Sequence, residues 1–167
     1  MKLFKLDTKA QKNITPYLWQ SFLAFGSLLI ILYFLDTISS AAIVAALGSS
    51  VFVVFASPYS YSARPQSVIG GHIVGLICGI LCAWLVYPRL SMYLPADSSM
   101  YIAAALAVGL ALFFMCISNT EHAPAAGTAL GMVVNRWNLN TILFIISSVI
   151  ILSLIKKLMG KRLKTLI

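Results

Sequence analysis

Two short stretches of polar and small residues interrupt an otherwise apolar sequence, and they hold most of the side chains that could do chemistry. The first, residues 57–72, reads SPYSYSARPQSVIGGH, and the second, residues 118–130, reads SNTEHAPAAGTAL. Pro65 and Pro124 each stand where a helix is predicted to start, because proline favours the first helical turn. A helix N-terminus offers free N–H groups and about half a positive charge. Both stretches are therefore predicted to attract an anion.

The polar side chains in these stretches are of the types that bind anions or carry protons. Arg64 adds a full positive charge, and neighbouring hydroxyl and amide groups add neutral hydrogen bonds. Histidine titrates near neutral pH, and polar groups at membrane depth are functional candidates by default. Two structural interpretations stay open: Arg64 as a topology signal, and His72 as the partner of a neighbouring carbonyl. The predicted substrate-binding residues are Arg64, Gln66, Ser67, His72, Asn119, Thr120, Glu121, His122, Gly127 and Thr128.

The composition indicates that a lipid bilayer surrounds the elements that carry these residues. Of the 167 residues, 60% are hydrophobic and only 10% are charged, whereas a soluble domain has about 25% charged residues. The net charge is +8, and nine of the twelve basic residues lie near the two ends of the chain. A nucleic-acid binder would spread its cations over one folded face. This distribution therefore argues against a nucleic-acid partner and for an integral membrane protein.

Five apolar segments approach the length of about 20 residues that a helix needs to cross a hydrocarbon core about 30 Å thick. They are Tyr17–Leu35, Ala41–Ser57, Val68–Val86, Met100–Ser118 and Thr141–Ile155. A sixth segment, residues 119–135, is more polar, and its predicted helical part, residues 123–135, would rise only about 20 Å. The sequence therefore predicts an all-α, polytopic transmembrane helical bundle, with five membrane helices plus one short broken or re-entrant helix.

Both ends of the chain are basic, and the positive-inside rule places both in the cytoplasm, which requires an even number of crossings. Six crossings satisfy this, and so do four crossings with re-entrant segments. Arg64 is then expected on the cytoplasmic side, and Arg89 and Arg136 on the other side. The expected parts, in the inner (cell) membrane, are a basic cytoplasmic segment over residues 1–16, one transmembrane domain over residues 17–155 and a basic cytoplasmic tail over residues 156–167.

Small residues recur every four positions in the third predicted helix, and such a ridge lets another helix approach closely. The ridge consists of Ser67, Gly71, Gly75, Gly79 and Ala83; shorter repeats are Gly127 with Gly131, and Ala103 with Ala107 and Ala111. Internal packing is the first interpretation, and the interface of a homo-oligomer is the second. Cys78, Cys82 and Cys116 are interpreted as small apolar packing residues, and no metal site or cofactor is predicted.

The two polar stretches resemble the paired motifs of the HPP family of integral membrane proteins, named for a His-Pro-Pro motif. In that family a segment like SPxSxxAxPRxxxxGH precedes one helix, and HPPAGATAL opens a later one. The counterparts here are Ser57-Pro58, Ala63 to Gln66, Gly71-His72, and His122 to Leu130. The second motif departs from the family pattern, with Ala123 in place of the first proline and AAGTAL in place of AGATAL.

The resemblance covers most of the chain, about residues 17–155, and implies a small helical membrane protein. Plant chloroplast relatives in this family are implicated in nitrite transport. The resemblance therefore implies nitrite, or a similar small monovalent anion, as the substrate.

The leading hypothesis is a transporter or channel for a small anion, without enzymatic activity. A non-transporting membrane assembly or interaction protein is the alternative, because the small-residue ridge fits it as well. A redox protein holding haem between His72 and His122 is a weaker alternative, since two histidines alone are a weak signal. The sequence holds neither a GxxxxGK phosphate loop nor an HExxH zinc motif, so ATP-driven pumping and zinc-dependent hydrolysis are not predicted.

Overall fold

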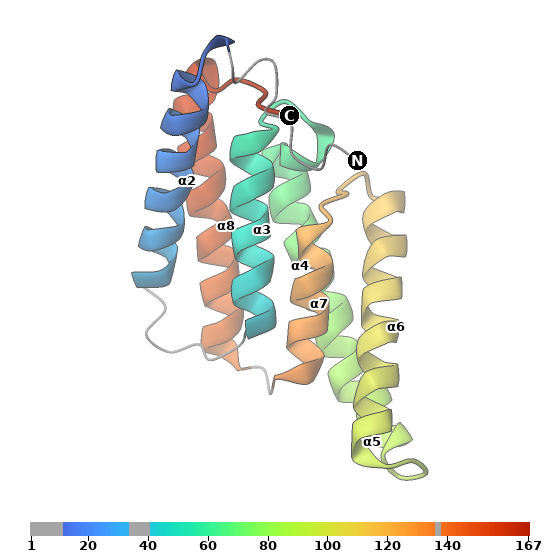
Figure 1. The fold of residues 1–167 in the computed structure, drawn as a ribbon. Coiled ribbons are helices and arrows are strands. Elements are labelled where there is room, and N and C mark those ends of the chain that lie inside the picture. Colours follow the sequence, from blue (N-terminus) through green and yellow to red (C-terminus); the bar gives the residue numbers. More distant parts are fainter. Residues whose placement is uncertain (1–11, 34–40, 136–137) are drawn as a thin grey trace, which may run out of the picture.

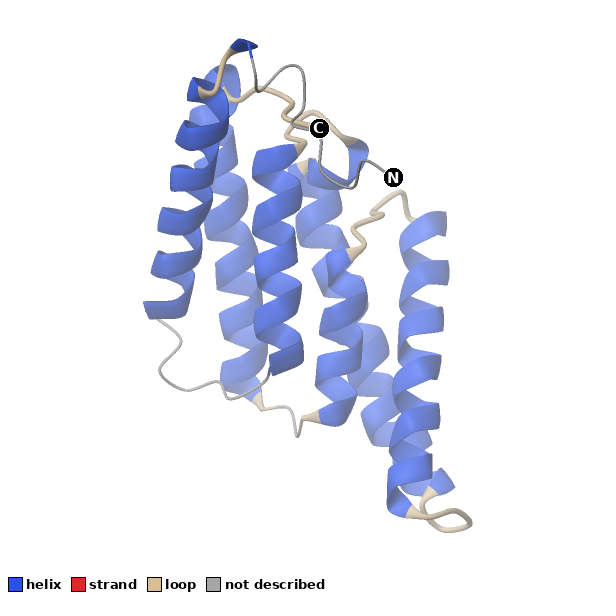
Figure 2. Cartoon of the chain, viewed as in Figure 1, coloured by secondary structure: helices blue, strands red, loops and turns tan. Residues whose placement is uncertain are grey.

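The computed structural model describes residues 12–33, 41–135 and 138–167, and within them the chain forms a bundle of six main helices (Figure 1). Figure 2 shows only helices, loops and turns in this part of the chain. The N-terminal residues 1–11, and Arg136, lie outside the described residues. The elements are α2 (Thr15–Tyr33), α3 (Ala41–Ala56), η1 (Tyr61–Ala63), α4 (Pro65–Leu81), η2 (Cys82–Val86), α5 (Tyr87–Leu90), α6 (Ala96–Ile117), α7 (Pro124–Val134), α8 (Leu139–Met159) and η3 (Gly160–Arg162).

The helix lengths are those of a multi-pass membrane protein with complete and short passes. Four helices are long and apolar enough to cross a bilayer: α2, the continuous helix from α4 to α5, α6, and α8 with η3. The apolar helices α3 and α7 are shorter, with 16 and 11 residues. At 1.5 Å per residue α7 rises only about 17 Å, which is about half of a hydrocarbon core. The predicted short helix is therefore confirmed, and it is α7.

Successive helices alternate in direction, and both described ends of the chain lie at the same end of the bundle (Figure 1). The Gln20 side chain in α2 donates to the Lys164 carbonyl at 2.8 Å and accepts from the Lys164 N–H at 2.7 Å. The Leu166 N–H also bonds to the carbonyl of Ala56, the last residue of α3. The C-terminal tail thus lies against the start of α2 and the end of α3. An even number of passes places the two ends of the chain together in this way. Its basic part begins inside a helix, because Lys156 and Lys157 belong to the last turn of α8.

The short helix α7 lies between α3, α4 and α6, and small residues let it approach all three closely. A Cβ added to Gly75 of α4 would lie 2.5 Å from the carbonyl oxygen of Ala125 in α7. A Cβ added to Gly131 would lie 2.7 Å from the Ile43 side chain of α3. Ala107 of α6, at 0% exposure, belongs to the buried apolar cluster that also contains residues of α7. The ridge therefore packs inside the protein, which confirms the first interpretation; a homo-oligomer stays a prediction and would need another surface.

The cysteines divide between core and surface. Cys78 and Cys82 are buried in the apolar cluster that joins α4, α6 and α7. Cys116, near the end of α6, is exposed. The prediction that all three pack internally is thus wrong for Cys116, because its position on α6 faces away from α4 and α7.

The helix that begins as α4 passes through a proline without ending. Pro88 has no N–H, and its ring would clash with the carbonyl of Trp84, four residues earlier, in a regular helix. The chain widens to a π-helical turn over Cys82–Val86, in which the Tyr87 N–H bonds to the Cys82 carbonyl five residues back. This local widening accommodates the proline and lets the helix continue to Leu90.

Gly75→Ala is expected to destabilise the protein by about 1–3 kcal/mol, because the added methyl group would push against the Ala125 carbonyl. Gly109→Ala in α6 is the matched control, since nothing lies within 4 Å of the position of its added Cβ. Thermal unfolding in detergent measures both variants. Equal stability of the two variants would contradict the close approach of α4 and α7.

Cysteine labelling tests the even number of passes. In a variant without the native cysteines, Asn13→Cys and Thr165→Cys should react with a membrane-impermeant maleimide from the same side. Ser91→Cys, in the turn that follows α5 at the far end of the bundle, should react from the other side. Labelling of the first two positions from opposite sides would refute this topology.

Candidate functional site

The two polar stretches lie against each other at the end of the bundle that also holds the C-terminal tail (Figure 1). The Tyr61 hydroxyl donates to the Asn119 carbonyl at 2.8 Å, and the Ser62 carbonyl oxygen lies 2.7 Å from Nδ1 of His122. The helices α4 and α7 both start from this junction and run in the same direction. The prediction that two helix N-termini point the same way from neighbouring loops is therefore confirmed.

The second stretch begins with a sharp turn at Asn119, which ends α6. Asn119 has a φ of 54°, in the left-handed region. Its N–H bonds to the Cys116 carbonyl at 3.4 Å, and the next N–H, of Thr120, bonds to the Met115 carbonyl at 3.0 Å. This is a Schellman motif, in which asparagine is the usual substitute for glycine. Asn119, predicted to contact substrate, thus has a capping role and an exposed side chain.

Behind this junction two histidines share one serine hydroxyl. Nε2 of His72 and Nε2 of His122 each lie 2.9 Å from Oγ of Ser50 in α3. On the far side, Nδ1 of His72 lies 2.8 Å from Oγ1 of Thr128 in α7. The ring centres of the two histidines are 5.3 Å apart. Both histidines, Ser50 and Thr128 are completely buried, at 0% exposure.

Counting donors and acceptors assigns part of the hydrogens in this network. The Ser62 carbonyl can only accept, so Nδ1 of His122 carries a hydrogen. The Ser50 hydroxyl has a single hydrogen and three polar neighbours: the Ala46 carbonyl oxygen at 2.8 Å, and Nε2 of each histidine at 2.9 Å. Nδ1 of His72 pairs with the Thr128 hydroxyl on the far side.

This network holds four parts of the chain together without any charge. A buried polar group left without a partner costs about 1–3 kcal/mol, and here each of the four ring nitrogens has one. A fully satisfied buried network fixes the relative position of the elements that it joins. The structure thus gives His72 two hydroxyl partners, where the sequence suggested a carbonyl.

The two histidines do not form a haem or metal site in this arrangement. Oγ of Ser50 occupies the space between the two Nε2 atoms, where an iron and its porphyrin would have to lie. Within residues 12–33, 41–135 and 138–167, no three His, Cys, Asp or Glu side chains gather as a metal ion would require.

A group of charged side chains surrounds the outer rim of the junction. The guanidinium carbon of Arg64 lies 4.5 Å from the ring centre of Tyr61. Burial, and then the Glu121 carboxylate, raise the pKa of Tyr61 above its ordinary value of 10.0, although Arg64 opposes the shift. Tyr61 therefore keeps its proton at neutral pH and remains a donor. Nζ of Lys156 lies 2.5 Å from the Ala63 carbonyl oxygen, so two cations flank this segment.

The start of α4 is the better of the two helix N-termini for an anion. The side chain of its N-cap residue, Arg64, makes no capping bond, and the same holds for Ala123 at the start of α7. Ser67 is only 1% exposed, and its Oγ has no hydrogen-bond partner among the described residues. At the start of α7, in contrast, the Ala125 N–H already bonds to the His122 carbonyl at 2.9 Å.

The remaining predicted substrate-binding residues lie in different parts of the structure. Gln66 is exposed next to Arg64, and Thr120 is half-buried, where its side chain fills the space beside Gly70. Glu121 is half-buried, and its Oε2 has no hydrogen-bond partner among the described residues. Gly127 lies against Ala46 of α3 rather than at the junction. The structure therefore brings the predicted residues together, except for Gly127, and it separates an exposed rim from a buried network.

Sequence reasoning missed four residues of the site: Ser50, Tyr61, Ser62 and Lys156. Ser50 is one polar residue in an alanine-rich apolar helix, and such a serine usually bonds to its own backbone, as Ser50 Oγ also does to Ala46 O at 2.8 Å. Tyr61 and Ser62 lie within the first stretch, and Lys156 was counted with the basic tail. The only signal for Tyr61 and Ser62 was their place near residues already chosen, and Ser50 and Lys156 had no such signal.

None of the described cavities is lined by a residue of the buried network. One, of about 430 Å³, is an apolar groove between α4 and α6 lined by residues such as Ile77 and Phe114, and it reaches Ser118 at the start of the second stretch. Two smaller ones lie beside the C-terminal tail. Because the imidazole rings are fully buried, a ligand would reach them only if the two polar stretches moved apart.

Comparison with known proteins gives a family and two relatives. Residues 9–165 match the family profile described as "HPP, transmembrane region". Two curated transmembrane proteins of Dictyostelium discoideum are similar: one is 29% identical over 99 residues, and the other is 33% identical over 93 residues. These matches cover 57% and 53% of this chain but only 32% and 27% of the relatives, so the chain spans at most about a third of their length. No solved structure matches the chain.

Ser50→Ala is expected to destabilise the protein by about 1–3 kcal/mol, because both histidines lose their shared hydroxyl partner inside the bundle. Ser49→Ala is the matched control, since Ser49 Oγ bonds to the same Ala46 carbonyl but touches neither histidine. Thermal unfolding in detergent should separate the two variants. The network would be unimportant for stability if both unfolded at the wild-type temperature.

Proposed function

The chain belongs to the HPP transmembrane family, and on that premise we propose that it is a transporter or channel for a small anion, with nitrite as the favoured substrate. The observation that carries the proposal is the junction of the two polar stretches, with cations at its rim. Arg64 is exposed on the first stretch, and Lys156 reaches the same stretch from α8. Two positive charges beside the same stretch raise the local concentration of an anion there.

The first turn of α4 supports recognition of the anion after this attraction. Its N–H groups, uncapped by the Arg64 side chain, and the unpartnered Oγ of Ser67 are neutral donors for the oxygens of a small anion. Transporters commonly use interrupted helices whose N-termini face an anionic group. Gln66 and Thr120 are further donors at the same place.

Passage beyond the rim requires the two stretches to separate. The non-helical parts of the two stretches are joined by Tyr61 to Asn119 and by Ser62 to His122, while the bond between His72 and Thr128 joins their helical parts. We propose that the first two bonds break while the inner bonds between the histidines, Ser50 and Thr128 persist. The buried network would then remain as the fixed wall against which the first stretch moves.

The position of the basic residues also supports a proposed orientation in the membrane. The basic C-terminal tail and the start of α2 lie at the junction end, and the positive-inside rule places that end in the cytoplasm of a cell whose inner membrane holds the protein. The anion site would then open to the cytoplasm. We propose transport and no catalysis, because the buried network consists of neutral hydrogen bonds whose donors and acceptors are all used.

Arg64→Gln is expected to slow nitrite flux into reconstituted liposomes by about tenfold, because a charged hydrogen-bond donor contributes about 1.5–3 kcal/mol. Arg89→Gln is the matched control, since Arg89 is exposed at the opposite end of the bundle, where it bonds to the Leu85 carbonyl at 2.8 Å. Raising the ionic strength should narrow the difference between wild type and Arg64→Gln.

Two results would reject the proposal. One is a nitrite flux equal to that of empty vesicles, with nitrate, formate, bicarbonate and chloride also inactive. The other is an equal loss of flux in both arginine variants. Absence of flux together with a stable, stoichiometric membrane partner would favour the assembly or interaction protein instead.

A further inference from the structure

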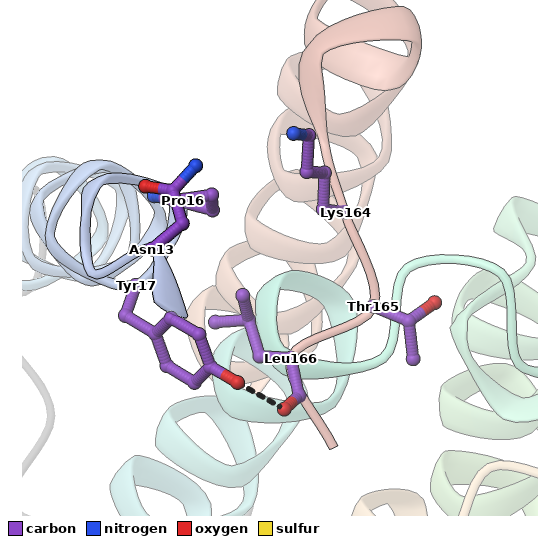
Figure 3. A pocket seen from close by; sticks show the side chains of 6 residues that line it. All are labelled: Asn13, Pro16, Tyr17, Lys164, Thr165 and Leu166. Carbon is purple, nitrogen blue, oxygen red and sulfur yellow. Dashed lines mark hydrogen bonds between the residues drawn. The ribbon is translucent and has the colours of Figure 1, made fainter. Parts of the chain in front are cut away.

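Two adjoining cavities lie where the C-terminal tail passes the start of α2. Their volumes are about 170 and 230 Å³, and both are lined by Asn13, Pro16 and Lys164. The first is completed by residues of the tail, and the second by Trp19 and Arg162. Figure 3 shows the first cavity, with Lys164 on one side and Asn13 and Pro16 on the other. Each volume is well above that of one water molecule, about 30 Å³.

The tail that forms one wall is held firmly through its backbone. The Gln20 side chain bonds to both the N–H and the carbonyl of Lys164, and the Tyr17 hydroxyl donates to the Leu166 carbonyl at 3.0 Å (Figure 3). Leu163 is buried at 2% exposure. The backbone is thus fixed by other groups, and the ammonium group of Lys164 forms no part of these bonds.

The chemistry of the walls is that of a membrane-interface site for an anion. Arg162 and Lys164 are basic, and none of the described lining residues is acidic. Trp19, which is 42% exposed, belongs to a residue type that gathers at the level of lipid headgroups. Further along α2, Phe22 and Phe25 are 66% and 62% exposed, as lipid-facing side chains are.

We propose that these two cavities bind the phosphate-bearing headgroup of an anionic phospholipid, whose acyl chains lie along the outer face of α2. Arginine pairs with phosphate through two parallel hydrogen bonds, and lysine adds a point charge. Basic pockets at helix ends on the cytoplasmic side are the usual binding places of acidic lipids. The site is separate from the junction of the two polar stretches, and it does not depend on which anion the protein transports.

Tryptophan quenching by brominated lipid tests this proposal. The chain has three tryptophans, and a Trp84→Phe/Trp137→Phe background keeps only Trp19. The full chain is reconstituted in phosphatidylcholine vesicles that contain a minor fraction of phosphatidylglycerol, and either the phosphatidylglycerol or the phosphatidylcholine is brominated. We expect brominated phosphatidylglycerol to quench Trp19 more than the bulk fraction of phosphatidylglycerol predicts. Arg162→Gln/Lys164→Gln should lower this preference by about fivefold for each charge removed.

Charge-matched variants separate the site from the general basicity of the tail. Lys157→Gln/Lys161→Gln removes two exposed cations that do not line the cavities, and it should keep the wild-type preference. Lys164→Arg keeps the charge and should also retain it. An unchanged preference in Arg162→Gln/Lys164→Gln, or an equal loss in the Lys157 and Lys161 variant, would overturn the proposal. Relief of quenching by millimolar inorganic phosphate, but not by chloride of equal ionic strength, would assign the site to soluble phosphate and overturn the lipid assignment.

Discussion

One serine hydroxyl, that of Ser50, connects α3 to both polar stretches. Its Oγ lies 2.9 Å from Nε2 of both His72 and His122, so α3, α4 and the start of α7 meet at a single oxygen atom. In a membrane no water is at hand to replace a lost partner, and an unpaired polar group there is costly. The non-helical backbone before α7 finds its partners elsewhere: the Thr120 N–H bonds to the Met115 carbonyl, and the Asn119 carbonyl accepts from the Tyr61 hydroxyl.

Close packing of small side chains makes that arrangement geometrically feasible. In a bilayer, helices associate through tight packing and hydrogen bonds, because lipid tails are as apolar as the helices themselves. The glycines of α4 bring its backbone against that of α7, and Gly127 and Gly131 do the same for α3. A side chain at these positions would separate the helices and pull the histidines away from Ser50. The small-residue ridge therefore contributes to the geometry of the site as well as to the packing of the helices.

Charge is arranged around this neutral centre rather than within it. The rim carries Arg64 and Lys156, and the neighbouring tail carries Arg162 and Lys164, all at the end where the described chain starts and finishes. Coulomb attraction between exposed charges acts over about 8 Å in physiological salt. The two proposals thus place a soluble anion and an anionic lipid at separate basic groups on the same end of the bundle.

The amino-acid sequence alone determined the membrane class, the helical segments, the short sixth helix and the two polar stretches, because hydropathy and proline positions are local properties. The position of the two stretches at one end of the bundle followed from the prediction that both basic ends of the chain lie on the same side of the membrane, which requires an even number of crossings. Tertiary structure decided which polar residues are exposed, that Asn119 caps a helix and Gly127 packs on α3, and that Ser50 joins the histidines. These depend on helix rotation and on contacts between residues far apart in the sequence, such as Ser50 and His122, which are 72 positions apart, and no local pattern records such contacts.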